Sequence, residues 1–312
     1  MIHSEQSGLV SFVMRTVGGR PREIRRAIAS VSANDWRPLE VVVVYQGEQN
    51  EQWEDLQKLP AEFAGIGLQV VRNPATGDRR AENLNIGWTY AKGRYLGFLD
   101  DDDTLAPNHV SLLVDALQVT RKTWAYAQVT LRKENTNLEV VSESTPFRRH
   151  AFSLKSLWSE NFLPIHSFLL DRSQLHSALA VHPFYEELDR SEDWDFLLRL
   201  AFYHEPAVIE EFTATYHVST GGGNTNLSLM DSVGREDREQ LNREAWARCK
   251  AIVESRKAGL ADSVWWARDY FGLSASVGAA QDQHAAPSPE IQRRSLRERV
   301  IRKLIRLLER LQ

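Results

Sequence analysis

The stretch Leu96-Gly97-Phe98-Leu99-Asp100-Asp101-Asp102-Asp103 decides the fold that we expect for this chain. The apolar run that begins at Tyr95 predicts a buried strand, and four consecutive carboxylates end it. Four like charges repel one another, so a fold that keeps them together needs a counter-charge, and a divalent cation bound by oxygens is the simplest one. Ligands of open α/β sheets bind beyond the carboxyl ends of the strands, where this acidic cluster (residues 100–103) would lie. The alternative is a solvated acidic turn before a helix that Pro107 helps to start.

Strands and helices alternate before the acidic cluster. We expect strands at residues 9–14, 39–45 and 68–71, and helices from residue 22, from 47 to 59 and from 81 to 92. The β-branched run at residues 41–44 is too continuous to be half exposed and predicts a central parallel strand. Three such alternations predict an α/β fold with a mostly parallel, Rossmann-like central sheet, right-handed crossovers and flanking helices.

The pattern loosens after the acidic cluster. We expect a helix at residues 108–118, a strand at 124–131, a loop or hairpin at 133–150, a strand at 165–170 and a helix from about residue 191. That last helix carries Glu192, Asp193 and Asp195 in its first turn. Compensation of the helix dipole is one explanation of these acids, and a catalytic role is the other.

The C-terminal third has a different character. We expect a core domain at residues 1–225, a helical extension packed on or next to it at 226–280, a linker at 281–289 and a basic amphipathic helix at 290–312. Eight basic and three acidic side chains accompany the apolar stripe of this last helix. It could lie on an anionic membrane, form a coiled coil with a partner, or pack on its own domain.

Bulk composition excludes several classes of protein. A net charge of −4, 42% hydrophobic and 26% charged residues are ordinary for a globular protein and give no basic field for nucleic acid. The one cysteine, Cys249, excludes an internal disulfide and a cysteine-based zinc cluster. Neither a signal peptide nor an apolar run of roughly 20 residues is evident. We therefore expect a cytoplasmic protein, with peripheral attachment to the inner face of the cell membrane if residues 290–312 bind lipid.

Three motifs together resemble glycosyltransferase family 2, whose fold is the nucleotide-diphospho-sugar-binding GT-A type. They are the segment at residues 79–87 with Asn85-Ile86-Gly87, the segment at 91–103 with its Ala-Lys-Gly start and Asp-x-Asp-Asp end, and Glu192-Asp193-Trp194-Asp195. The resemblance covers roughly residues 9–218. It implies an inverting, metal-dependent enzyme that moves a sugar from a nucleotide-diphospho-sugar to a hydroxyl of a glycan or lipid-linked glycan, in bacterial cell-surface polysaccharide synthesis.

The resemblance also implies roles for particular residues. Asp193 would be the catalytic base, and Glu192 would orient the donor or the acceptor. The implied nucleotide contacts are Arg15, Thr16, Tyr45, Gln46, Arg80, Asn83, Asp100 and Asp101. The implied ligands of Mn²⁺ or Mg²⁺ are Asp100, Asp102 and His217, and the cation would offset the charge of the leaving diphosphate.

Two segments depart from the family pattern. The first strand ends in Met14-Arg15-Thr16-Val17-Gly18, where the family usually has Pro-Thr-Tyr-Asn. The second ends in Tyr45-Gln46-Gly47-Glu48, where it usually has Asp-Asp-Gly-Ser. These changes leave the identity of the nucleotide base open.

Two other functions remain as alternatives. A sugar-nucleotide-forming nucleotidyltransferase would use residues 15–20 as a triphosphate loop, but it leaves Glu192 and Asp193 unexplained. A non-catalytic GT-A-like binding module would account for the two departures.

Overall fold

The computed structural model describes residues 6–220, 235–263 and 267–272. Within the chain, Met1–Gly272 forms one compact unit, and the described residues all belong to it. The linker predicted at 281–289 and the helix predicted at 290–312 lie outside the described residues.

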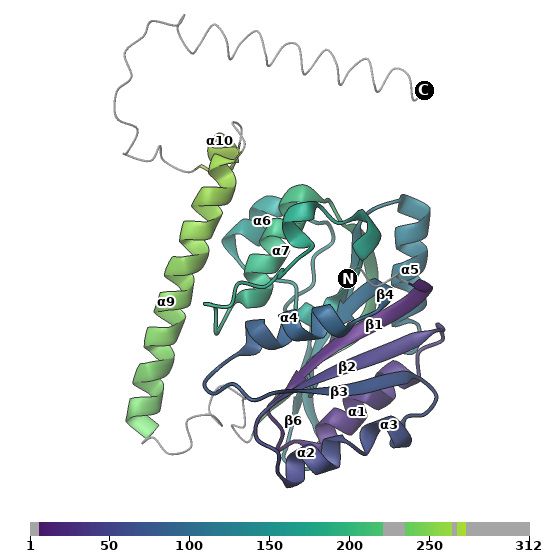
Figure 1. Cartoon of the computed structure of the whole chain (residues 1–312). Coiled ribbons are helices and arrows are strands. Elements are labelled where there is room, and N and C mark those ends of the chain that lie inside the picture. Colours follow the sequence, from purple (N-terminus) through teal and green to yellow (C-terminus); the bar gives the residue numbers. More distant parts are fainter. Residues whose placement is uncertain (1–5, 221–234, 264–266, 273–312) are drawn as a thin grey trace, which may run out of the picture. The chain divides into compact units, whose positions relative to one another are not determined.

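A mixed sheet forms the centre of this unit (Figure 1). Four parallel strands make one side, in the order β3 (Gly67–Asn73), β2 (Leu39–Gln46), β1 (Gln6–Thr16) and β4 (Gly93–Phe98). The sheet continues through β8 (Phe168–Asp171), β6 (Trp124–Glu134), β9 (Ala207–Ser219) and β5 (Thr104–Leu105), and β7 (Val140–Ser144) pairs with β6. β8 is antiparallel to both β4 and β6, whereas β6 and β9 are parallel.

The helices complete the fold. They are α1 (Pro21–Ser32), α2 (Glu51–Leu56), α3 (Leu59–Glu62), α4 (Arg80–Tyr90), α5 (His109–Thr120), α6 (Leu154–Ser159), α7 (Glu192–Tyr203), α9 (Arg235–Asp262) and α10 (Ala267–Phe271). Short 3-10 turns span Ile165–Ser167, Arg172–Gln174 and Ser177–Leu179.

Each face of the sheet has its own apolar layer. On one face, alternate residues of β1 and β2, among them Phe12 and Val41, join the buried sides of α1 and α5 in one hydrophobic cluster. On the other face, aromatic rings under α4 and α7 pack edge to face, with Phe98 lying 5.2 Å from Phe184 and 6.2 Å from Phe196 between ring centroids. β2 is buried along its whole length and parallel to both neighbours, which confirms the central strand predicted there.

Gly87 lets α4 approach β1 closely. A Cβ atom at this position would lie 2.2 Å from Cγ1 of Val13, which is far inside van der Waals contact. The glycine of the Asn-x-Gly motif is therefore a packing requirement of the helix–sheet contact. Asn85 of the same motif holds the chain ahead of α7, because its side chain donates to the carbonyl of Phe184 (2.8 Å) and accepts from that residue's N–H (3.0 Å).

β7 pairs with the end of β6, which confirms the hairpin that was one of the two alternatives for residues 133–150. Two other segments differ from the expectation. The strand predicted at 165–170 begins only at Phe168 after a 3-10 turn. The long strand β9 was not expected. Its interior residues Glu210, Glu211 and Phe212 are exposed, and the register against β6 shifts twice nearby, so the segment lacks the alternation typical of a strand.

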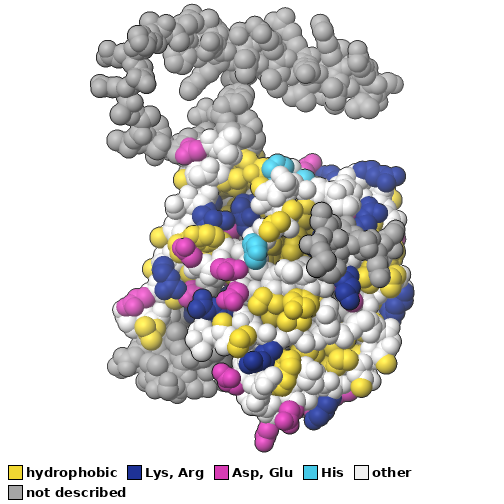
Figure 2. Space-filling model, in the orientation of Figure 1, with side chains coloured by type: hydrophobic (Ala, Val, Ile, Leu, Met, Phe, Trp, Pro, Cys, Tyr) yellow, Lys and Arg dark blue, Asp and Glu magenta, His cyan; other side chains and the backbone are white. Residues whose placement is uncertain are grey.

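Helix α9 extends the helix predicted at 237–256 in both directions. Its buried residues Ala245, Cys249 and Val253 lie on one side, and the helix contacts α7. The domain boundary at residues 225/226 remains a prediction. On the face drawn in Figure 2, charged side chains of both signs are interspersed among the described residues.

Candidate active site

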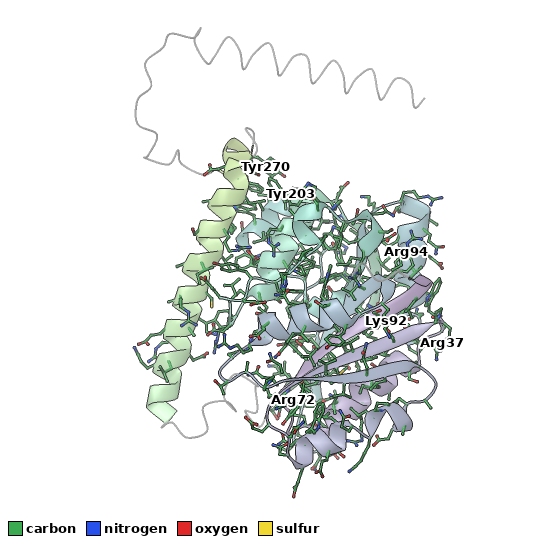
Figure 3. The ribbon with its side chains drawn as sticks, viewed as in Figure 1. Arg37, Arg72, Lys92, Arg94, Tyr203 and Tyr270 are labelled. Atoms are coloured by element: carbon green, nitrogen blue, oxygen red, sulfur yellow. The ribbon has the colours of Figure 1, made fainter. Side chains whose placement is uncertain are left out.

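The site lies where the parallel strands end. Because β1, β2, β3 and β4 run in the same direction, Thr16, Gln46, Asn73 and the acidic cluster share one edge of the sheet. Figure 3 shows Arg72 near this edge, at the end of β3, whereas Arg37 and Lys92 lie at the opposite edge.

The four carboxylates of the acidic cluster have different surroundings. Asp101 and Asp103 are buried: Asp101 accepts a 2.5 Å hydrogen bond from Thr16, and Asp103 accepts one of 2.8 Å from the backbone N–H of His217. The side chains of Asp100 and Asp102 keep 28% and 29% of their surface exposed. The first and third acids of the cluster are therefore the ones open to a ligand, and the second and fourth fix the turn.

Arg15 connects the acidic cluster to the start of α7. Its Nε donates to Oδ1 of Asp100 at 2.9 Å, and its Nη1 contacts Oε1 of Glu192, a residue 177 positions further along the chain. Glu192 is buried, so this ion pair is shielded from water. Arg15 stands where the family usually has a proline, and here its side chain holds two motifs of the site together.

Asp193 is half-buried beside this ion pair. Its Oδ2 accepts a hydrogen bond from the amide of Asn161 (3.1 Å), and its Oδ1 accepts one from the N–H of Trp194 (2.7 Å). Burial and the neighbouring charge of Glu192 raise the pKa of Asp193 to about 7, although Arg15 acts in the other direction. A carboxylate with a pKa near neutrality is well suited to accept a proton at physiological pH.

Negative charge is crowded around Asp102. Burial, together with Asp103 and Asp101, raises the pKa of Asp102 well above its usual value even though Arg20 contacts it. Burial is also the largest reason that the pKa of Asp101 rises to about 6, whereas Arg15 holds the pKa of Asp100 below its usual range against the effect of burial.

These residues fit a hard divalent cation that also binds substrate. Oxygen donors suit Mn²⁺ or Mg²⁺, and Mg²⁺ in particular is commonly held by one or two carboxylates plus substrate phosphates and water. In the part of the chain that the structure describes, no three His, Cys, Asp or Glu side chains converge on a metal position. Asp100 and Asp102 are the partly exposed carboxylates of the acidic cluster that such a cation could contact.

Four residues that were expected to contact the nucleotide instead make hydrogen bonds or ion pairs with other protein groups. Arg80 donates two hydrogen bonds to Asp78 (3.0 and 2.7 Å). Burial acts to lower the pKa of Arg80, but nearby carboxylates raise it, and Glu192 contributes most among these charges. Tyr45 is buried against Trp53 and donates to Asn50 (3.2 Å). Gln46 and Asn83 belong to a buried amide network, in which Asn83 donates to Gln46 (3.0 Å) and Gln46 donates to the carbonyls of Ala75 and Gly77.

His217 has a structural environment in this arrangement. Its Nδ1 lies 2.7 Å from Glu134 and its Nε2 lies 2.8 Å from Thr104, so both ring nitrogens have partners. Burial lowers its pKa, and Arg26 lowers it further. We therefore leave His217 out of the ligand set that we propose below.

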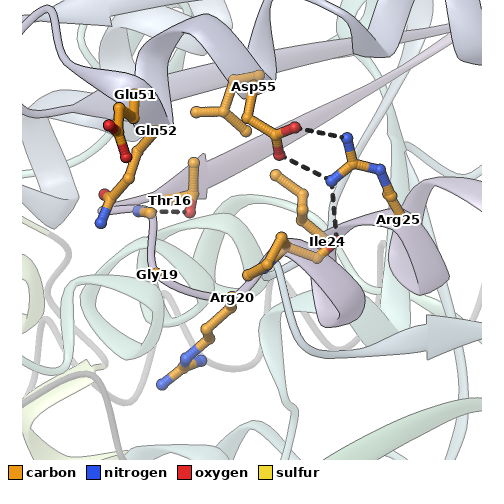
Figure 4. Close-up of a pocket in the computed structure, with 11 residues that line it drawn as sticks. Thr16, Gly19, Arg20, Ile24, Arg25, Glu51, Gln52 and Asp55 are labelled. Carbon is orange, nitrogen blue, oxygen red and sulfur yellow. Dashed lines mark hydrogen bonds and ion pairs between the residues drawn. The ribbon is translucent and has the colours of Figure 1, made fainter.

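Two cavities border the loop between β1 and α1. One, of about 430 Å³, is lined by Thr16, Gly18, Gly19, Arg20 and residues of α1 and α2, among them Gln52 and Asp55 (Figure 4). The other, of about 310 Å³, lies on the side of Asp102, Arg26 and Glu134 and also includes Gly19 and Arg20. Figure 4 shows the Arg20 side chain directed away from the Arg25–Asp55 pair.

Sequence reasoning missed Asn161 and the partners that fix the acidic cluster. Asn161 precedes no recognisable motif, and its contact with Asp193 arises only in the folded chain. His166, considered only weakly from sequence, lies with its Nδ1 2.8 Å from Asp103. Asp195 binds Arg199 (2.9 Å) and Arg256 of α9 (2.5 Å), so it connects the first turn of α7 to α9.

Known proteins share sequence similarity with this chain. A model of the family described as glycosyl transferase family 2 matches residues 11–177. An uncharacterised glycosyltransferase of Methanocaldococcus jannaschii is 24% identical over 229 residues, which are 70% of this chain and 73% of that protein. WcaA of Escherichia coli K12, whose name provisionally assigns it to colanic acid biosynthesis, is 26% identical over 227 residues, 68% of this chain and 74% of its own.

Solved structures share the fold. The S. aureus TarS fragment 1–349 in complex with UDP-GlcNAc matches 85% of this chain and 73% of its own, with a TM-score of 0.53 and 16% identity. The mannosyltransferase PcManGT from Pyrobaculum calidifontis, in complex with GDP-Man and Mn²⁺, matches 84% of this chain and 78% of its own, with a TM-score of 0.50 and 13% identity. The match spans only 36% of the longer TarS chain. These likenesses confirm the predicted GT-A fold.

Proposed function

Because this chain belongs to glycosyltransferase family 2 and is a glycosyltransferase, we propose that it transfers a sugar from a nucleotide-diphospho-sugar to a hydroxyl of a glycan acceptor, with inversion and with the help of a divalent cation. The observation that carries this proposal is the Arg15 bridge between Asp100 and Glu192. It supports a single donor site with the acidic cluster on one side and Asp193 on the other.

Each residue near this site has a task in the proposed reaction. Asp193 accepts the proton of the acceptor hydroxyl as that oxygen attacks the anomeric carbon and the bond to the diphosphate breaks. Arg15 holds Glu192 at the sugar and Asp100 at the nucleotide. Asp102, with Asp100, would hold Mn²⁺ or Mg²⁺, which supplies stabilisation of the negative charge on the departing diphosphate. Asn161 orients the carboxylate of Asp193 through its 3.1 Å hydrogen bond.

We assign the donor's nucleoside to the 430 Å³ cavity beside Thr16. Its volume lies within the usual range of small-molecule sites, and it adjoins the loop that carries Arg20. Tyr45 and Gln46, the positions expected to read the base, are occupied by other contacts. Gln52, which lines the cavity, is the side chain that we expect to contact the base instead.

We infer the class of acceptor from the name of one relative. The name of the E. coli relative supports a role in the synthesis of a cell-surface polysaccharide. No helix in the described residues is long and apolar enough to cross a membrane. We propose a cytoplasmic enzyme whose residues 290–312 bind the membrane surface or a coiled-coil partner.

A thermal-shift screen followed by a turnover assay tests this function. Nucleoside diphosphates and their sugars are compared with and without Mn²⁺, because a ligand that binds the folded state raises the melting temperature by mass action. Hydrolysis of the best donor is then measured for Asp102→Ala and Asp193→Asn, with Asp115→Asn as the exposed-carboxylate control. We expect the first two variants to lose activity and the control to keep it.

Other outcomes would point to other functions. Release of pyrophosphate from a nucleoside triphosphate would identify a nucleotidyltransferase. Nucleotide binding without any turnover would identify a binding module. Full activity in Asp193→Asn would refute the role of the base.

A further inference from the structure

Arg20 contacts Asp102, one of the two carboxylates that we expect to bind the cation. It occupies the last residue of the loop between β1 and α1, and its guanidinium contacts Oδ2 of Asp102 and lies 3.4 Å from Oδ1 of Asp101. The side chain is mostly buried, with 17% of its surface exposed. A divalent cation at Asp102 and this guanidinium would repel each other at such a short distance.

The loop that carries Arg20 has room and conformational freedom. Gly18 and Gly19 adopt positive φ angles of 81° and 79°, and nothing lies within 4 Å of the Cβ that Gly19 lacks. Arg20 and Gly19 line both cavities on the two sides of the loop. A guanidinium that leaves Asp102 would therefore move along cavities that the loop already borders.

The neighbouring arginines are anchored by other partners. Arg26 makes two bonds to Glu134 (2.9 and 2.8 Å) and one to the backbone carbonyl of Asp102 (2.9 Å). Arg15 is held between Asp100 and Glu192, and Arg80 is held by Asp78. Arg15 and Arg20 each contact an expected cation ligand, Asp100 and Asp102 respectively. Arg15 is also tied to the buried Glu192, whereas Arg20 borders the cavities on both sides of its loop.

We propose that Arg20 is a displaceable counter-ion, which holds Asp102 in the absence of a cation and turns to the donor's diphosphate when a cation binds. This inference rests on the proposed function. A guanidinium matches the geometry of phosphate oxygens and remains charged at every working pH, so the same side chain can serve both partners. The exchange would make the binding of cation and of nucleotide mutually reinforcing.

Mn²⁺ binding, followed by the electron paramagnetic resonance signal of the free ion, tests the first half of the proposal. Arg20→Gln should bind Mn²⁺ alone about tenfold more tightly than the wild type, equivalent to about 1.4 kcal/mol. Arg22→Gln removes the same charge from an exposed position on α1 and should match the wild type. Arg20→Lys keeps the charge and should also remain close to the wild type.

Nucleotide binding tests the second half. UDP, GDP, ADP and CDP are titrated in the presence of Mg²⁺, and the tightest of them should bind Arg20→Gln about tenfold more weakly than the wild type and Arg22→Gln. Unchanged Mn²⁺ affinity in Arg20→Gln, with Asp102→Asn abolishing it, would overturn the role of Arg20 and leave the cation site intact. Equal Mn²⁺ binding by Asp102→Asn and the wild type would instead overturn the proposed cation site, and this inference with it.

Discussion

Helix α9 contacts the first turn of α7, which carries the proposed base Asp193, through the buried carboxylate of Asp195. Replacing Arg256 with Gln tests that link. Asp195 is buried in the first turn of α7, two positions after Asp193. It accepts bonds from Arg256 at 2.5 and 3.1 Å and from Arg199 at 3.0 and 2.9 Å. The guanidinium of Arg256 also lies 4.1 Å above the ring of Tyr185.

The expected loss of stability depends on which partners Asp195 keeps after the Arg256→Gln substitution. Removing one partner of a buried ion pair costs about 3–5 kcal/mol when the remaining charge is left alone. Here Asp195 keeps Arg199, and Arg256 has 30% of its side chain exposed, so we expect a smaller loss of about 1–2 kcal/mol in the free energy of unfolding. That loss corresponds to a decrease of roughly 2–8 °C in melting temperature. Because the turn that carries Asp193 loses a support, kcat should fall about tenfold, while KM for the donor stays nearly constant.

Urea unfolding and steady-state kinetics measure these two quantities. The control is Arg248→Gln on the same helix, whose ion pair with Asp189 has an arginine that is 56% exposed and should contribute less than about 1 kcal/mol. Equal stability and equal kcat in the two variants would show that the Asp195–Arg256 pair does not position Asp193.

Further predictions concern the base, the helix–sheet contact, the cation and the nucleoside. With Asp193 at a pKa of about 7, kcat/KM should rise with pH through about 7, and Asp193→Asn should lose that limb of the profile; a rate independent of pH from 5 to 9 would contradict it. The same carboxyl binds its proton more tightly in the folded chain than in the unfolded chain, where its pKa is about 3.8. Its contribution to stability therefore falls as pH rises from 4 through 7, and Asp193→Asn should flatten this dependence. Gly87→Ala should destabilise the fold by about 1–2 kcal/mol, since overpacking against Val13 outweighs the better helix propensity of alanine, and adding Val13→Ala should cost less than the sum of the single changes. EDTA should abolish transfer and added Mn²⁺ should restore it, whereas activity that survives exhaustive chelation would remove the cation from the proposed reaction. Gln52→Ala should weaken binding of the preferred nucleoside diphosphate with little change in melting temperature of the free protein, and an unchanged affinity would place the base outside the 430 Å³ cavity.

The parallel strands β1 to β4 and the positions of the motifs could be predicted from local patterns. The run at residues 41–44 is buried on both faces, and acids that follow an apolar strand lie at its carboxyl end whatever the rest of the chain does. The two-residue period of a strand also places Tyr45 on the same face of β2 as Val41 and Val43, so its ring packs toward α1 and α2.

Contacts between distant side chains could not be predicted from one sequence. Arg15 meets Glu192 because β1 ends beside the start of α7, and this depends on the sheet order, which local periodicity does not encode. The resemblance to the family implied a metal contact for His217, yet its partners Glu134 and Thr104 come from the strands that flank β9. The pairing of these strands decides what the imidazole contacts.

The most direct test of the donor site is a crystal structure of the protein with Mn²⁺ and its tightest-binding nucleoside diphosphate, with the cation located by anomalous scattering. We predict an anomalous peak bound to Asp102 and to both phosphates, with the carboxylate of Asp193 facing the terminal phosphate across a space that fits one sugar ring. An anomalous peak located away from the acidic cluster, or an Asp193 carboxylate turned away from the phosphates, would contradict the proposed donor site.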